Sequence, residues 1–399
     1  MKYMNEPLIY RSTVNPKRNK KRMIVNFFST IILISLIYIV LGADFSSKIF
    51  KRIFGMNHRQ FLSISISILY TIILAVSLNL STGCLGEMVL GHAGFMAVGA
   101  YTGSLFLKFA NAPDNNSLYT IMAIVSGFIA AGIVGFLVGI PVLRFRGDYL
   151  AIITLGFGQI ISTIIKLIGF DGAGKMIGIP LNRNIILYLV IVIVVVGLIF
   201  VFMKSRHGRA ILSIREDAIA AEACGISVTK YKVFTFTLSA ALAGVAGVLF
   251  SQNLGVLEPA KFEFNYSIEL LLIVVLGGLG SFTGSIVATI ILLLLPEMLR
   301  FFNDYRLVIY SLLLIIIMLT KPNGLLGRYE FSSYTLYKKI MKFFKNLPTS
   351  IKKMPSSVKK YYKNIFNFFK NFRQNMVNIF KKMGKNFKTF FNRGSQSDE

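Results

Sequence analysis

The chain has 399 residues, of which 54% are hydrophobic and 15% charged, and its formal net charge is +27. Soluble globular chains usually contain about 25% charged residues, so this composition excludes disorder over most of the length and argues against a single water-soluble domain. The two cysteines, Cys84 and Cys224, lie in unrelated segments and lack the spacing of a disulfide framework or a metal site. The sequence predicts a membrane protein without a metal site.

Apolar stretches that can cross a bilayer, which takes about 20 residues, recur along the chain. In order they are 24–41, 61–80, 88–107, 119–143, 149–168, 185–203, 233–250 and 307–320. The segment 267–300 is too long for one span and is interrupted by Gly277, Gly278 and Gly280, so we expect two short spans joined by a tight turn. Because backbone groups in lipid must bond within their own segment, the expected fold class is an all-α polytopic transmembrane helical bundle of about ten spans.

Small residues recur at helix-packing spacing within these spans. Examples are Gly99 with Gly103, and Gly244 with Gly247. Small side chains let helix backbones approach closely in a membrane, so we expect these positions to serve packing.

Basic loops predict the sidedness, because short loops rich in Lys and Arg stay in the cytoplasm. The best marker is 204–232, with six basic residues, and Arg144 and Arg146 mark a second inside loop. We therefore expect a basic cytoplasmic N-terminus (1–23), a transmembrane domain (24–320) and a basic cytoplasmic tail (321–399) of a multi-pass inner (plasma) membrane protein. The first outer loop opposes this arrangement, since it contains Lys48, Lys51, Arg52 and Arg59.

Polar residues inside a membrane are costly and therefore point to function, but here they are few. Glu87 and His92 flank the start of the third expected span, close to several glycines. Exposed backbone at a glycine-rich helix entry can line a cavity, so the candidate substrate-pathway residues are Glu87, Gly91, His92, Gly94 and Phe95. The alternative is a loop near the interface, with Glu87 solvated and His92 hydrogen-bonded.

The inside loop 204–232 contains a segment of helix formers, 215–225, that a glycine closes. Ile214, Ala218 and Ala221 recur at helical spacing, and such a helix can dock into a groove on a partner. The alternative is a helix lying on lipid headgroups, which favours a basic polar face. The acidic residues favour a protein partner, and the candidate coupling residues are Arg215, Glu216, Asp217, Glu222 and Gly225.

A phosphate-binding loop is mimicked at 169–175, which fits G-x4-G-K. The next residue should be Ser or Thr, to bind magnesium, but it is Met176, and the segment follows an expected span instead of a strand. No catalytic residues and no ATP site or other cofactor site are expected in this chain.

With these segments in place, the chain resembles the integral-membrane permeases of branched-chain amino acid ABC importers. The matching stretches are 91–101, 143–158, 208–225, 275–284 and 321–327, and together they span roughly residues 60 to 330. The Arg-Gly-Asp-Tyr-Leu-Ala block at 146–151 is similar to that of one of the family's two paralogous permease subunits.

The resemblance implies a non-enzymatic transport subunit. Its expected partners are a second paralogous permease, two cytoplasmic ATPase subunits that hydrolyse ATP, and an extracytoplasmic substrate-binding protein. The segment 215–225 matches the family's coupling loop, whose motion would switch the bundle between outward and inward access. The same family includes urea and short-chain amide importers, so such a substrate stays open as the alternative.

The tail departs from the family, which ends soon after 321–327. Residues 321–399 carry 18 Lys and Arg against three acidic residues. Apolar residues recur there at three- and four-residue steps: Ile365, Phe369, Phe372, Met376, Ile379, Met383, Phe387 and Phe390. This pattern is typical of a basic amphipathic helix on anionic lipid. Interleaved basic and aromatic residues also bind nucleic acid, but beside a membrane-embedded body we expect lipid.

Overall fold

A computed structural model describes residues 58–145, 147–168, 170, 172, 174–299, 305–321, 324, 325 and 327. The expected N-terminus (1–23), the first expected span (24–41) and the tail from residue 328 onward lie outside the described residues.

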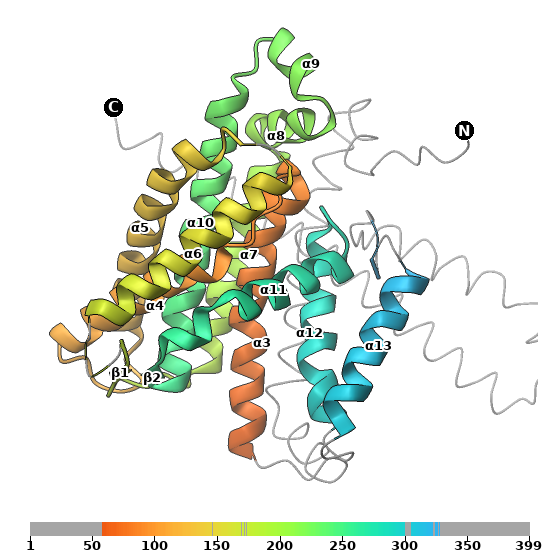
Figure 1. Cartoon of the computed structure of the whole chain (residues 1–399). Helices are drawn as coiled ribbons and strands as arrows, with labels where there is room; N and C mark the ends of the chain where they lie inside the picture. The colour runs from red at the N-terminus through yellow and green to blue at the C-terminus, as the bar shows by residue number, and fades with distance from the viewer. Residues whose placement is uncertain are drawn as a thin grey trace, which may run out of the picture. The chain divides into compact units, whose positions relative to one another are not determined.

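The described chain is dominated by helices (Figure 1). They are α3 (His58–Asn79), the π-helix η2 (Leu80–Leu85), α4 (His92–Phe109), α5 (Ser117–Val142), α6 (Asp148–Ile168), α7 (Ile185–Lys204), α8 (Arg206–Glu216), α9 (Ala218–Ala223), α10 (Val228–Leu254), the 3-10 helix η3 (Pro259–Phe262), α11 (Phe264–Gly277), α12 (Phe282–Met298) and α13 (Arg306–Thr320). Two short strands, β1 (Met176–Ile177) and β2 (Val256–Leu257), pair antiparallel. The all-α helical bundle is confirmed.

Five helices within the described residues are long and apolar enough to cross a membrane. They comprise Leu62–Leu85, which joins α3 and η2, together with α5, α6, α7 and α10. The helices α12 and α13 are apolar but shorter. The chain is therefore a multi-pass membrane protein, and the number of about ten spans stays a prediction.

Polar caps explain where several apolar helices begin. The side chain of Asn116 accepts a hydrogen bond from the backbone N–H of Leu118, and Asn184 does the same for Ile186. The hydroxyl of Ser281 accepts one from the N–H of Gly284 at the start of α12. Because the first N–H groups of a helix have no partner within it, these side chains fix the helix starts.

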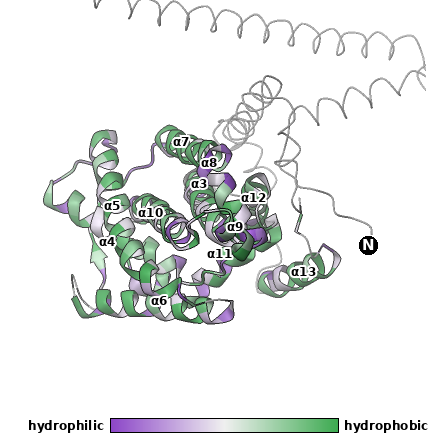
Figure 2. Cartoon of the chain, turned by 90° about the horizontal axis from the view of Figure 1, so that it is seen from above, coloured by the Kyte–Doolittle hydropathy of each residue, from purple (hydrophilic) through white to green (hydrophobic). Residues whose placement is uncertain are grey.

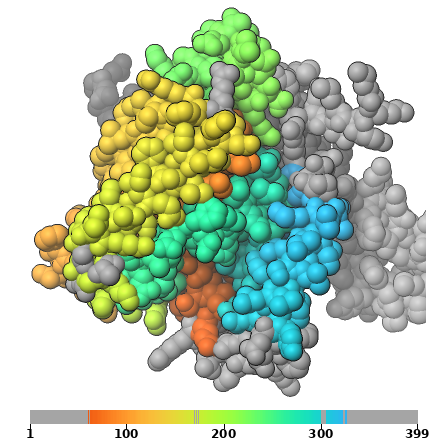
Figure 3. Space-filling view, viewed as in Figure 1, coloured from red at the N-terminus to blue at the C-terminus, as the bar shows by residue number. Residues whose placement is uncertain are grey.

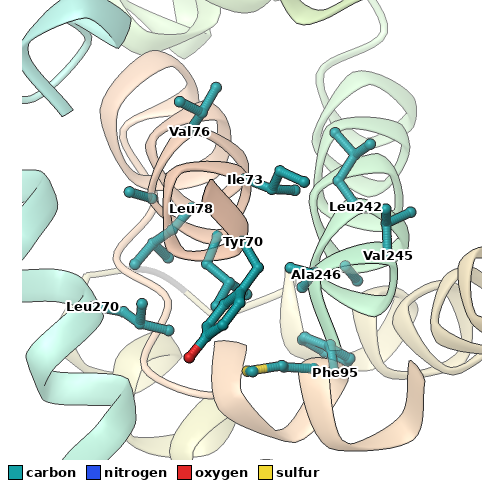
Figure 4. Packing of buried hydrophobic residues seen from close by; sticks show 14 of the residues in the cluster. Tyr70, Ile73, Val76, Leu78, Phe95, Leu242, Val245, Ala246 and Leu270 are labelled. Carbon is teal, nitrogen blue, oxygen red and sulfur yellow. The ribbon is translucent and has the colours of Figure 1, made fainter. Parts of the chain in front are cut away.

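The helix α10 forms the centre of the bundle and contacts α3, α4 and α5 (Figure 2). Nearly all of its residues from Thr235 to Asn253 are buried. Apolar side chains of α3, such as Ile73, face Leu242 and Val245 of α10, with Phe95 of α4 and Leu270 of α11 close by (Figure 4). Outside this core, α5 and α7 expose rows of apolar side chains, as expected of surfaces that face lipid.

Backbones approach closely where α4 crosses α10. A Cβ atom added at Gly99 would lie 2.3 Å from the Cα of Gly244, and one at Gly247 would lie 2.1 Å from the carbonyl oxygen of Met96. No side chain fits at these distances, so the predicted packing role of Gly99, Gly244 and Gly247 is confirmed.

Two predictions about the glycine-rich breaks have different outcomes. The segment 267–300 does form two short helices, α11 and α12, and Gly278 and Gly280 take positive φ angles in the turn between them. The expected span 88–107 begins too early, because the helix starts only at His92 and the segment 86–91 is not helical. There the N–H of Leu90 donates to the Thr154 hydroxyl at 3.1 Å, which satisfies a backbone group that a helix would otherwise bond.

Candidate functional site: a coupling loop and its contacts with the bundle

The two ends of the bundle differ. One end carries α8 and α9, and the other carries β1 and β2 (Figure 1); we call them the α9 end and the β end. The helix α8 buries Gly208, Ala210, Ile211 and Ile214, whereas α9 buries only Ala221. The helix α9 is thus held by the bundle through α8 and presents most of its surface.

The expected single helix over 215–225 is wrong, because it is divided at Asp217. This residue has extended backbone angles, and its carboxylate accepts hydrogen bonds from the N–H groups of Ile219 and Ala220 at 2.9 and 3.0 Å. Asp is among the strongest N-cap residues, so the sequence held the signal for a second helix start at this position.

Gly225 closes α9 as the sequence indicates. Its φ angle is +82°, its N–H donates to the carbonyl of Glu222, and the N–H of Ile226 donates to that of Ala221. These two bonds form a Schellman motif, in which the left-handed position favours glycine.

Arg215 connects this loop to two inner turns of the bundle. A Cβ atom added at Gly86 would lie 3.1 Å from its Cγ, and one added at Gly280 would lie 2.8 Å from its Nη1. The side chain therefore runs from the end of α8 past the end of η2 to the turn between α11 and α12. Arg215 thus lies against both turns.

A second connection joins the start of α10 to the segment 86–91. The ammonium of Lys232 forms an ion pair with the carboxylate of Glu87, and the two side chains are only 11% and 12% exposed. Glu87 is thus neither solvated, as the loop interpretation expected, nor free to bind a solute in this conformation.

The other candidate pathway residues lie inside the bundle. His92 is 1% exposed and its Nε2 lies 2.9 Å from the hydroxyl of Ser77. Phe95 is 3% exposed and packs edge-to-face on Phe236, and a Cβ atom at Gly94 would lie 2.8 Å from the Cα of Gly158 on α6. A Cβ atom at Gly91 would lie 2.1 Å from the carbonyl oxygen of Thr154, also on α6. These residues pack α4 against α3, α6 and α10, and their role along a solute path stays a prediction.

Sequence reasoning missed a polar contact between α3 and the turn before α12. The amide of Asn79 donates to the carbonyl of Ser281 and the hydroxyl of Ser285, and it accepts from the N–H of Gly280 at 2.8 Å. The sequence shows only an asparagine inside an apolar segment and does not indicate which residues this side chain contacts.

The segment that mimics a phosphate-binding loop lies at the β end. Lys175 forms an ion pair with Glu258 at 3.3 Å, and the next residues form β1. A phosphate-binding loop needs a strand before it and a helix after it, and here the order is helix, loop, strand.

Comparisons with known proteins agree with this architecture. The sequence profile of a family described as "Branched-chain amino acid transport system / permease component" matches residues 60–318. The high-affinity branched-chain amino acid transport system permease protein LivM of Escherichia coli (strain K12) is 38% identical over 291 residues, which cover 64% of this chain and 67% of LivM. LivM of Salmonella typhimurium is 37% identical over the same shares.

A second type of permease is similar over a shorter stretch. The high-affinity branched-chain amino acid transport system permease protein LivH of Escherichia coli (strain K12) is 33% identical over 147 residues, which cover 36% of this chain and 47% of LivH. No solved structure matches the chain significantly. The profile spans well over half of the chain, and with the helical bundle it shows that the chain belongs to the family of permease components of branched-chain amino acid transport systems.

Proposed function

We propose that the chain is one of two paired permease subunits of an ATP-driven importer of branched-chain amino acids. In this assembly two ATPase subunits bind at the α9 end and hydrolyse ATP, and an extracytoplasmic binding protein delivers the solute at the β end. The chain conducts the solute and carries no cofactor. Both chain termini and the α9 end then lie in the cytoplasm.

The similarity to permeases named for branched-chain amino acid transport carries this proposal. Similarity to both LivM and LivH supports a second, related permease as partner. Because these relatives are named for branched-chain amino acids, this substrate is favoured over urea or short-chain amides.

The geometry of the α8–α9 loop supports the coupling role. The helix α9 exposes 76% of Ile219, and Glu216, Asp217 and Glu222 are exposed beside it. A lone exposed isoleucine rimmed by carboxylates suits insertion into an apolar groove with a basic rim on a protein, whereas anionic lipid would repel the carboxylates. Arg215 and the Lys232–Glu87 pair then transmit the motion of this loop to the segment 86–91 and the turn at Gly280.

The test is uptake by the complete assembly in vesicles. With the binding protein and ATP supplied, we expect uptake of labelled leucine, isoleucine and valine, and loss of that uptake when the second permease is omitted. Uptake of urea without uptake of these amino acids would contradict the substrate assignment.

A further inference from the structure

A carboxylate on α11, that of Glu269, lies away from the coupling loop and within electrostatic range of tyrosines from three helices. Glu269 is exposed on the surface of the bundle. Three tyrosines from three helices lie within electrostatic range of it: Tyr70 of α3, Tyr266 of α11 and Tyr310 of α13. Figure 3 shows α11 on one face of the molecule, between α6 and α13, with the lower part of α3 beneath it. We call these four residues the Glu269 cluster.

The Glu269 cluster lies at membrane depth. Tyr70 is the ninth residue of the apolar segment Leu62–Leu85, which places it about 12 Å from the nearer end of that segment at 1.5 Å per residue. Ser267, two residues before Glu269, accepts a hydrogen bond from the N–H of Ala93 in the first turn of α4. The carboxylate therefore lies far from both ends of the bundle.

A carboxylate at this depth does not face hydrocarbon, because a charge at the bilayer centre costs about 2.5–3.5 kcal/mol or more. In the part of the chain that the structure describes, no basic side chain forms an ion pair with Glu269. The exposed face of α11 is mixed, since Asn265 and Glu269 lie beside Phe264 and Ile268, whereas the large side chains that α5 exposes, such as Ile129 and Ile133, are apolar. The α11 face must therefore be covered by water, a solute or another polar group.

Two of the tyrosines have a neighbour with a hydroxyl group on α3, Ser67 for Tyr70 and Thr71 for Tyr266. Tyr70 is nearly buried, and its hydroxyl points away from α10 (Figure 4). Tyr310 is half-buried on α13, a helix on which Leu314 is the one buried residue. Aromatic faces attract cations, by about 0.5–1 kcal/mol at exposed sites and about 2 kcal/mol when water is excluded. An anion next to such rings is suited to a primary ammonium group.

We propose that the Glu269 cluster binds the ammonium group of the amino acid as it crosses the membrane, with the α11 face lining the solute path. This inference rests on the proposed function and assigns part of its substrate site. Repulsion turns the solute's own carboxylate away from Glu269. Urea has no ammonium group and gains nothing from this carboxylate.

The first experiment measures whether a cation in water reaches the cluster, without requiring transport. The background is the assembled transporter with Cys224→Ser, because Cys224 is exposed whereas Cys84 is buried. Two variants in this background, Tyr310→Cys and Ile133→Cys, are each treated with a positively charged methanethiosulfonate reagent. We expect Tyr310→Cys to react at least tenfold faster than Ile133→Cys, and at least threefold slower once Glu269→Gln is added. Equal rates at the two positions, or no effect of Glu269→Gln, would overturn the proposal.

The second experiment measures uptake of labelled L-leucine in vesicles holding the complete assembly. Glu269→Gln should lower the initial rate at least tenfold, Glu269→Asp should stay within threefold of wild type, and Glu297→Gln, the same change on α12, should stay within twofold. Tyr310→Leu should lower the initial rate of uptake two- to fivefold. Tyr310→Phe should lower it less than twofold, because the aromatic ring is kept. Stimulation of ATP hydrolysis by the loaded binding protein should persist in all five variants.

The outcomes separate this inference from the proposed function. If wild type transports leucine and Glu269→Gln transports it equally well, the Glu269 cluster is not the ammonium site. If Glu269→Gln loses the second permease on purification, the carboxylate instead holds the subunits together and the inference fails. If wild type takes up no branched-chain amino acid, the proposed function fails, and the labelling experiment still decides whether the cluster attracts cations.

Discussion

At the scale of single residues, Asn79 shows how a buried polar side chain can join distant parts of a membrane protein. It lies at the end of α3 and is fully buried, and its amide bonds both to the backbone of the turn before α12 and to Ser285. A buried backbone group left without a partner costs about 1–3 kcal/mol. One side chain thus holds together segments about 200 positions apart.

We expect Asn79→Ala to lower the free energy of unfolding by about 2 kcal/mol, because the N–H of Gly280 and the carbonyl of Ser281 lose this partner. Thermal unfolding in detergent measures the change. The control is Ser126→Ala, since the hydroxyl of Ser126 donates only to Ala123 of its own helix and its loss should cost less than about 0.5 kcal/mol. Equal stability of the two variants would contradict the bridging role.

A second prediction at the scale of single residues concerns Arg215 and the coupling of ATP hydrolysis to uptake. Arg215→Ala removes the side chain that lies against Gly86 and Gly280, so movement of α8 no longer reaches these turns. We expect uptake to fall at least tenfold while ATP hydrolysis stays within twofold of wild type, and Arg215→Lys, which keeps the charge on a slightly shorter side chain, should retain part of the uptake. Parallel loss of uptake and hydrolysis in Arg215→Ala would show that Arg215 serves ATPase docking instead.

At the scale of elements, the contact between α4 and α10 depends on glycine. Gly99→Ala would place its Cβ 2.3 Å from the Cα of Gly244, whereas Gly132→Ala on α5 would place its Cβ 3.4 Å from the Cβ of Ala241. Overpacking a core costs about 1–3 kcal/mol. We expect Gly99→Ala to lose stability in that range and Gly132→Ala to be tolerated, as judged by melting temperature. A melting temperature for Gly99→Ala equal to that of wild type would mean that the two helices can separate freely.

A second prediction at the scale of elements concerns the docking of the ATPase subunit on the short helix α9. Ile219→Asp places a charge on its exposed apolar side chain, so we expect the amount of ATPase subunit that co-purifies to fall at least tenfold with the bundle still folded. Thr229→Asp adds the same charge at an exposed position at the start of α10 and should have little effect. If both variants retain the ATPase equally, Ile219 is not part of the docking surface.

At the scale of the whole molecule, apolar length and glycine spacing predicted the helical bundle, the division of 267–300 and the close packing of Gly99 and Gly244. These features follow from local sequence, because the length of an apolar segment and the spacing of its small residues can be read from neighbouring positions. The start of α4 was placed too early, since the bond between Leu90 and Thr154 joins residues 64 positions apart.

The sites were harder to predict for the same reason. The cap at Asp217 was readable from sequence, yet the contacts of Arg215 with Gly86 and Gly280 were not. Glu269 lies early in an apolar segment, but two of its three tyrosines, Tyr70 and Tyr310, belong to other helices. A single sequence does not show which residues of distant segments meet.

The dependence of solute accumulation on the ATPase subunits tests the account most directly. Vesicles are prepared with the two permeases alone and with the complete assembly, each supplied with ATP and the loaded binding protein. We predict accumulation of leucine against its gradient only in the complete assembly. Uphill accumulation by the permeases alone, or by this chain alone, would contradict the account.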